Sequence, residues 1–176
     1  MTPEEFTRKL QAEQQAFKNW FDKDLPVIVE VEAVNHFTES FQNEGFTDVT
    51  LVKWDNVERR KNPKMGKRGE VLKNQKAGVT QKILTKSGSL GRSIEVERSG
   101  PGEVVIWTNP DAFEKEDKAG GLIKCDPYGL AHNEGTTTAG RGNRTTIPKR
   151  QFMGHSKVLE EKIMKISKVK LIYIFK

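Results

Sequence analysis

YGLAHNEGTTTAGRGNRTTIPKRQFMG, residues 128–154, is the stretch on which our interpretation of the fold depends. Its middle, residues 136–146, contains threonine, glycine, arginine, asparagine and one alanine, so it offers almost nothing to a hydrophobic core. Polar segments of this kind lie at protein surfaces, and a long polar loop on a fixed base often carries function. We therefore expect residues 136–146 to form a projecting loop. The apolar and aromatic residues on either side should form its rigid base, with paired or strand-like ends.

The whole chain has 176 residues, and we expect residues 1–176 to form one domain. Hydrophobic residues make up 35% of the chain and charged residues 31%, which indicates a modest core and much exposed surface. Cys125 is the only cysteine, so the sequence has neither an internal disulfide nor a cysteine-rich zinc site. No apolar run approaches the ~20 residues of a membrane span, so we expect no membrane contact. The net charge of +6 permits non-specific contact with DNA.

Two helices are predicted in the first part of the chain. Thr2 and Glu5 form a capping-box pattern, and apolar residues recur from there at helical spacing, which predicts a helix over about 3–22. Asp24 is suited to cap a second helix, and Gly45 is suited to the left-handed residue that follows its end. The apolar positions assigned to this second helix are Val27, Ile28, Val31, Val34, Phe37 and Phe41.

A β-hairpin is predicted in the middle of the chain. Residues 85–94 are expected to form a short helix or turn that leads into a strand at about 92–98. Residues 99–102, Ser-Gly-Pro-Gly, have turn chemistry, and the β-branched and aromatic residues at 103–108 indicate the second strand. Residues 109–127 are expected to form a charged loop.

Basic residues dominate residues 59–79, which contain a single acid, Glu70. Glycines and Pro63 interrupt any helix there. We interpret the segment as a solvated, mobile insertion. A nucleic-acid-binding module that uses residues 59–76 is an alternative, although the segment has no interleaved aromatic residues on which bases could stack.

The last part of the chain predicts a helix that begins at Ser156, followed by a strand-like tail at 169–176 that is rich in β-branched and aromatic residues. Together these patterns predict an α+β fold. It has two N-terminal helices, projecting loops, and a C-terminal helix with a strand tail. A small antiparallel sheet, formed by residues 92–108 and 128–152, should pack on the long helix at 27–44.

His132 and Asn133 are the residues most like a catalytic pair, because His–Asn clusters occur at metal-dependent phosphodiester sites. That chemistry also needs a metal, a second ligand cluster and a base on a rigid element. The other candidate ligands lack the close, repeated spacing of zinc sites. They are Cys125, Asp126, Glu134 and His155. We therefore expect no catalytic residue, no metal site and no cofactor, and we expect His132 to order the base of the loop. A metal-dependent nuclease that uses His132 and Asn133 is the alternative.

Three blocks of the sequence occur in the order found in one known family. Residues 84–94, LTKSGSLGRSI, are similar to the family pattern "L…TG.L..SI" at the start of a hairpin. Residues 128–135 are similar to its "YA..H..G" block, and residues 147–154 to its "IP.R.F.G" block. The chain thus resembles the phage virion morphogenesis family, the Mu-type G tail-completion proteins of phages and prophages. The positions that shape the matching motifs are Gly88, Leu90, Ser93, Ile94, Gly135, Pro148, Phe152 and Gly154.

The resemblance implies a small α+β protein without enzymatic activity that completes tails or joins them to heads, as a subunit of a ring. It implies other tail, neck or head-completion proteins as partners. It also implies a place in the virion, with assembly in the cytoplasm of the bacterial host. The residues that we expect to contact partners are Arg141, Arg144, Lys149, Arg150, Tyr128 and His132.

Overall fold

The computed structural model describes residues 1–72, 78–85, 87–116, 122–124, 128–139, 142 and 144–175. The helices are α1 (Pro3–Asn19), the π-helical turn η1 (Trp20–Asp24), α2 (Leu25–Asn43), α3 (Glu58–Lys61), α5 (Ser89–Arg92), the 3-10 turn η2 (Pro110–Phe113), α6 (Gly129–Glu134) and α7 (Lys157–Ile174). The strands are β1 (Gly45–Thr47), β2 (Leu51–Lys53), β3 (Ile94–Gly100), β4 (Glu103–Thr108), β5 (Glu114–Glu116), β6 (Leu122–Lys124), β7 (Thr136–Ala139) and β8 (Thr145–Ile147).

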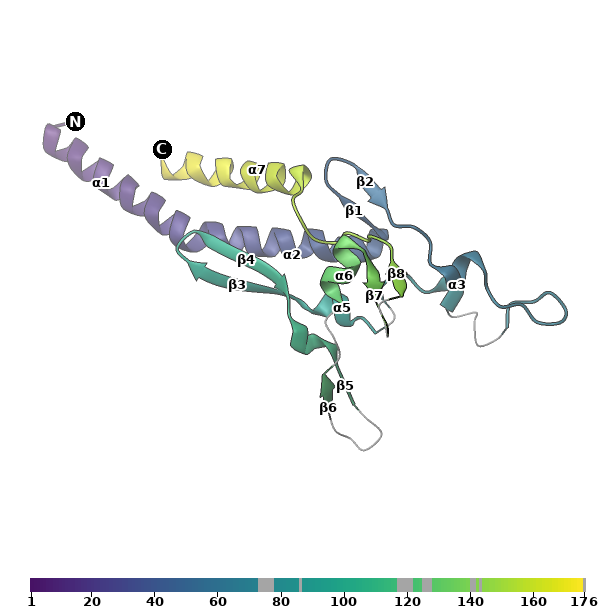
Figure 1. The fold of residues 1–176 in the computed structure, drawn as a ribbon. Helices are drawn as coiled ribbons and strands as arrows, with labels where there is room; N and C mark the ends of the chain where they lie inside the picture. The colour runs from purple at the N-terminus through teal and green to yellow at the C-terminus, as the bar shows by residue number, and fades with distance from the viewer. Residues whose placement is uncertain are drawn as a thin grey trace.

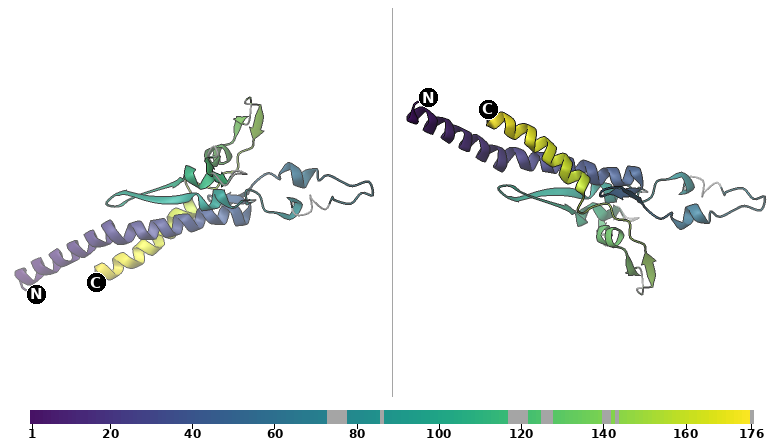
Figure 2. Two further views of the ribbon diagram at one scale, coloured as in Figure 1. Left: turned by 90° about the horizontal axis from the view of Figure 1, so that it is seen from below. Right: turned by 90° about the horizontal axis from the view of Figure 1, so that it is seen from above.

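These elements form an α+β fold around one long helix, as predicted (Figure 1). The helix α7 lies along one side of α2, and the β3–β4 hairpin lies along another side (Figures 1 and 2). Consecutive strands pair antiparallel, and each described pair is a separate two-stranded sheet. The predicted single sheet from residues 92–108 and 128–152 is therefore wrong. Each of these two segments forms its own hairpin, and the described strands of the two hairpins belong to separate sheets.

The first forty residues form one continuous helix rather than two. The predicted capping box is present: the Thr2 hydroxyl accepts from the amide of Glu5 at 3.2 Å, and the Glu5 carboxylate accepts from the amide of Thr2 at 2.7 Å. Asp24 has helical dihedral angles and makes no capping hydrogen bond, so its predicted role is wrong. Pro26 lacks an amide hydrogen, and its ring crowds the carbonyl four residues earlier. The wider π turn directly before Pro26 accommodates the ring without ending the helix.

The long helix ends at a residue other than the predicted one. Glu44, not Gly45, adopts the left-handed conformation, with φ 49° and ψ 46°. Gly45 belongs to β1, where a Cβ atom would lie 2.5 Å from the carbonyl oxygen of Val52. Glycine is needed there because the two strands approach closely. Phe46, the next residue, is buried and has an edge contact with His36, with ring centroids 5.8 Å apart.

The core forms on one face of α2, where Phe37 and Phe41 are buried. The ring of Phe41 lies 5.2 Å from that of Phe152 and 5.8 Å from that of Trp54, measured between centroids. Segments that are far apart in the sequence therefore meet on this face. The buried cluster consists of Ala33, Phe37, Phe41, Phe46, Trp54, Ile83, Leu90, Ile94, Phe113, Phe152 and Leu159.

The predicted buried stripe of α2 is partly wrong. Val27 and Val31 are 42% and 50% exposed, and Val34 packs at the edge of the core. All of the predicted positions lie in α2, and its buried residues Pro26, Ala33, Phe37, Ser40 and Phe41 follow an adjoining face of the helix that shares only Phe37 and Phe41 with the predicted positions. The face that carries Ala33 and Phe37 is the one that the hairpin and the later segments cover.

The hairpin β3–β4 is confirmed, with Ile94 paired to Thr108. The predicted short helix or turn before it is α5, whose Leu90 is buried in the core. Residues 109–127, predicted as a loop, contain η2 and the β5–β6 pair. Cys125 lies outside the described residues.

The C-terminal helix α7 begins where predicted, since the Ser156 hydroxyl accepts from the amide of Leu159 at 3.2 Å. It continues to Ile174, so the predicted strand tail at 169–176 is wrong. Leu171 and Ile174 extend the half-buried stripe of the helix at an interval of three residues. This helical periodicity outweighs the β preference of the individual side chains.

Removing the ring of Phe41 should destabilise the whole fold. Phe41→Ala is expected to lower the free energy of unfolding by about 3–5 kcal/mol, because it opens a cavity between Trp54 and Phe152. The control Val49→Ala changes a residue that is 60% exposed and should cost no more than about 0.5 kcal/mol. Denaturant titration measures both variants. Equal effects of the two substitutions would show that the α2 face is not the core.

Candidate assembly surface

The segment 148–154 is fixed to α6 by one side chain. Asn133 Oδ1 accepts hydrogen bonds from the backbone amides of Phe152 and Met153, both at 3.0 Å. A single carboxamide oxygen thus satisfies two consecutive amides of a segment that has no strand partner of its own. The Asn133 side chain therefore has a structural role that the sequence did not indicate.

The same segment is attached to the core from the other side. The indole Nε1 of Trp54 donates to the carbonyl of Gln151 at 2.7 Å, and the buried hydroxyl of Ser40 donates to the carbonyl of Phe152 at 3.2 Å. Buried backbone groups of an irregular segment need such partners, because an unpaired one costs free energy comparable to a lost hydrogen bond. Segment 148–154 is thus a rigid base, as predicted.

His132 lies inside this base. Its carbonyl accepts from the backbone amide of Arg150 at 2.7 Å, and its ring lies edge-on to Tyr128 with centroids 5.6 Å apart. The ring of Tyr128 in turn lies 4.5 Å from that of Phe113, which belongs to the core. Burial, and then the nearby charge of Arg150, lower the pKa of His132, so this imidazole is neutral at neutral pH. These contacts fit the prediction that His132 orders the loop base.

The polar loop projects as a hairpin. Thr136 pairs with Ile147 and Ala139 with Thr145, so β7 and most of β8 lie within residues 136–146 rather than on either side of them. Gly135 starts the hairpin at φ 75°, where a Cβ atom would lie 2.8 Å from the backbone nitrogen of Lys149. The first strand of the hairpin therefore leaves α6 directly beside the base.

The other motif positions lie mainly at the base of the hairpin and in the core. Leu90, Ile94 and Phe152 are core residues, and Ser93 is fully buried and donates to the carbonyl of Leu90 at 2.8 Å. Gly88 directly precedes α5, Pro148 follows β8, and Gly154 lies in the bend before α7. Most of these positions thus serve packing and chain direction.

The basic residues that we expected to contact partners do not share one surface. Arg144 is exposed beside the hairpin, and Lys149 is exposed with its ammonium group 3.3 Å from the carboxylate of Glu134. Arg150 is only 6% exposed, and burial lowers the pKa of its guanidinium. The Arg150 side chain therefore lies inside the base, where the neighbouring residues of the chain are also anchored. Arg141 lies outside the described residues.

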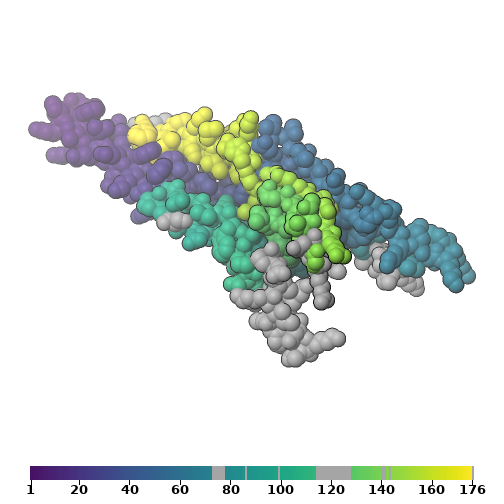
Figure 3. All heavy atoms as spheres, viewed as in Figure 1, coloured from purple at the N-terminus to yellow at the C-terminus, as the bar shows by residue number. Residues whose placement is uncertain are grey.

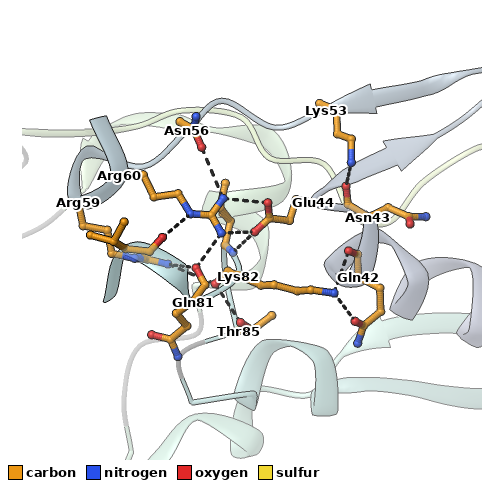
Figure 4. A network of polar contacts seen from close by, with 12 residues as sticks. Gln42, Asn43, Glu44, Lys53, Asn56, Arg59, Arg60, Gln81, Lys82 and Thr85 are labelled. Atoms are coloured by element: carbon orange, nitrogen blue, oxygen red, sulfur yellow. Dashed lines mark hydrogen bonds and ion pairs between the residues drawn. The ribbon is translucent and has the colours of Figure 1, made fainter. Parts of the chain in front are cut away.

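A polar network at the end of α2 was not evident from the sequence. Two guanidinium nitrogens of Arg60 donate to the two carboxylate oxygens of Glu44 at 2.8 and 2.7 Å (Figure 4). Glu44 also accepts from the amide of Ile83 at 2.7 Å, and Arg60 donates to the carbonyl of Gln81 at 2.8 Å. The paired hydrogen bonds explain how Glu44 holds a left-handed conformation that side chains other than glycine seldom adopt.

Arg59 extends this network. Its Nε donates to the carbonyl of Gly78 at 2.6 Å, and a terminal nitrogen donates to the carbonyl of Lys82 at 3.2 Å. The start of the basic segment 59–79 and its end at Gly78 are therefore anchored to each other. Both arginines donate to the backbone of residues 78–82, and Arg60 donates to Glu44 as well, while the mobility predicted for this segment stays a prediction.

Among the described residues, no group of three His, Cys, Asp or Glu side chains could hold a metal ion. Asp126, like Cys125, is outside that part of the chain. None of the helices in the described ranges is both long and apolar enough to cross a bilayer. Comparison of the chain with protein-family models, curated proteins and solved structures finds no match.

The Glu44–Arg60 pair should make stability depend on pH. The hydrogen bonds from Arg60 lower the pKa of Glu44, so the carboxylate stabilises the fold above its unfolded-state pKa of about 4.3. That contribution should disappear as the pH falls through the lowered folded-state pKa. Glu44→Gln is expected to cost about 1–3 kcal/mol at neutral pH and much less at about pH 3.

Urea denaturation at the two pH values measures this difference, and Glu39→Gln, an exposed change on α2, is the matched control. A loss that is the same at both pH values, or equal to that of the control, would show that the ion pair does not stabilise the turn.

Proposed function

We propose that this chain is a structural subunit of a phage or prophage particle that acts without catalysis in tail completion or head–tail joining, as a member of a ring. The observation that carries the proposal is the shape of the molecule. A small core holds a long helix and several hairpins that extend from it in different directions (Figures 1 and 3). Such arms bury little against their own chain and are suited to contact neighbouring subunits.

The accessible surface supports this interpretation quantitatively. The chain exposes 12622 Å², whereas a compact monomer of 20.0 kDa exposes about 8,700 Å². An excess of this size is typical of a protein whose arms are covered by other subunits in its working state. Subunits of closed rings have this property because each copy contributes surface to two interfaces.

The hairpin β7–β8 is the arm that best fits a ring contact. Its strands contain mostly threonine, and ordering each backbone residue costs about 1–2 kcal/mol, with few apolar contacts to offset it. The base beneath it is rigid, and Arg144 is exposed beside it. A neighbouring subunit with acidic groups would supply the contacts that the hairpin lacks.

The two alternatives are less well supported. A nuclease would use the His132–Asn133 pair, but the side-chain oxygen of Asn133 and the carbonyl of His132 hold the base of the hairpin. A nucleic-acid-binding module would use the basic segment 59–76, but Arg59 and Arg60 at its start donate to carbonyl and carboxylate oxygens of the chain itself. His132, Asn133, Arg59 and Arg60 are thus engaged in the fold.

Disruption of the gene in the phage or lysogen that carries it tests the proposal. Electron microscopy of the lysate should show filled heads and tails that are unjoined or unfinished, and the wild-type gene supplied on a plasmid should restore complete particles. Infectious particles of normal form and number in the absence of the gene would contradict it. So would metal-dependent cleavage of DNA by the pure protein that His132→Ala abolishes.

A further inference from the structure

The helix α1 has an apolar stripe that its own chain leaves uncovered. None of its 17 residues is buried. Phe6, Leu10, Glu13 and Phe17 follow one another at intervals of four, three and four residues, which places them along one face of the helix. Phe6 and Leu10 are each 54% exposed. This spacing is that of the a and d positions in a helix-to-helix seam.

Contacts within the chain cover only the last part of this face. The ring of Phe17 lies 6.1 Å from that of Phe175 at the end of α7, and the first turns of α1 extend beyond that point (Figures 2 and 3). A helix of this length is marginal in water when it stands alone, because most helical stability in proteins comes from packing of an apolar face. The exposed part of α1 therefore lacks the partner that such a helix normally has.

A groove marks the place where that partner would begin. Leu10, Glu13, Gln14, Phe17 and Phe175 line a cavity of about 390 Å³ between α1 and the end of α7. Its walls are mainly apolar, with a carboxylate and a carboxamide at the rim. Its occupant must therefore bring a bulky apolar side chain on a helix that runs alongside α1.

The charges of α1 identify the occupant. Acidic residues, Glu4 and Glu5, lie in its first turn, and Lys18 lies in its last turn. Lys9 and Glu13 lie between them, one helical turn apart, with their charged groups 3.6 Å from each other. A second α1 in antiparallel orientation, centred near residue 11, places Lys9 of each copy opposite Glu13 of the other and brings the acidic first turn to the level of Lys18. A parallel, in-register pair would place like charges opposite each other, which is destabilising.

We propose that a second copy of this chain covers α1, with the two α1 helices antiparallel. Phe6 of each copy then lies opposite Phe17 of the other and enters its groove at the end of α7. Lys9 of each copy meets Glu13 of the other, and the acidic first turn of each copy lies at the level of Lys18 of the other. The contact is isologous, so the same residues are used on both copies and the pair closes on itself.

The expected dimer is reversible. A fully exposed aromatic side chain offers about 200 Å² of surface. The half-exposed residues of the stripe and groove, counted on both copies, therefore bring roughly 800 Å² of apolar surface into the pair. Stable complexes bury about 1,200–2,000 Å² in total. The apolar stripe and the charged residues around it together only just reach the lower limit of this range. The surface lies well apart from β7–β8, so the pairing does not depend on the proposed function (Figure 1).

Sedimentation equilibrium of the full chain between about 1 and 200 µM tests the pairing, because this range brackets a micromolar dissociation constant. The wild-type chain should pass from monomer to dimer. Leu10→Glu should raise the dissociation constant at least tenfold, since it places charge in the wall of the groove that Phe6 of the other copy enters. Val49→Glu adds the same charge at a residue that is 60% exposed, in the turn between β1 and β2, which lies away from α1 (Figure 1), and should leave the constant unchanged.

A charge exchange tests the antiparallel orientation. Lys9→Glu places a new carboxylate of each copy opposite Glu13 of the other copy, so two pairs of like charges face each other. This variant should therefore weaken the dimer. Adding Glu13→Lys to that variant restores the opposite charges across the seam and should restore the wild-type constant. A monomer over the whole concentration range, a dimer that Leu10→Glu does not weaken, or a double variant as weak as Lys9→Glu would each overturn the proposal.

Discussion

The structure depends on the face of α2 that carries Phe37 and Phe41. The two rings provide the surface on which the β3–β4 hairpin, Trp54 and the segment around Phe152 all pack. Burial of apolar surface is the dominant favourable contribution to folding, and here it is concentrated near one end of a long helix. Elements that meet this face at only one end, such as the β7–β8 hairpin, are consequently arms with a fixed base.

Local signals in the sequence predicted the elements that are stabilised locally. The Thr2 capping box, the turn before β4 and the cap at Ser156 each involve residues within a few positions of one another, and all three occur. The end of α2 could not be predicted in this way. It depends on Arg60, which reaches Glu44 from sixteen residues away. The start of α2 was missed as well, because a π turn before Pro26 replaces the expected break. The strand prediction for residues 169–176 was wrong for a related reason, because packing along α7 determines the conformation of this segment.

The same distinction applies to the candidate assembly surface. A rigid base under a polar projection could be predicted from composition, because apolar residues flank residues 136–146 on both sides. The roles of individual side chains could not. Arg150 looks like its exposed neighbours in the sequence but is buried, and Asn133 resembles a catalytic residue but holds two backbone amides. Burial and hydrogen-bond partners are set by the tertiary structure, which a local pattern does not contain.

The pairing proposed for α1 would make this helix more stable in the dimer than in the single chain. The helix α1 is the simplest part to measure, because it has no buried residue in the single chain. Hydrogen exchange of the amides of residues 6–17 at increasing protein concentration tests this most directly. Slow exchange that appears only at high concentration is the predicted result, while the core amides around Phe41 stay protected throughout. Exchange of α1 that is equally slow in a dilute monomer would contradict the account.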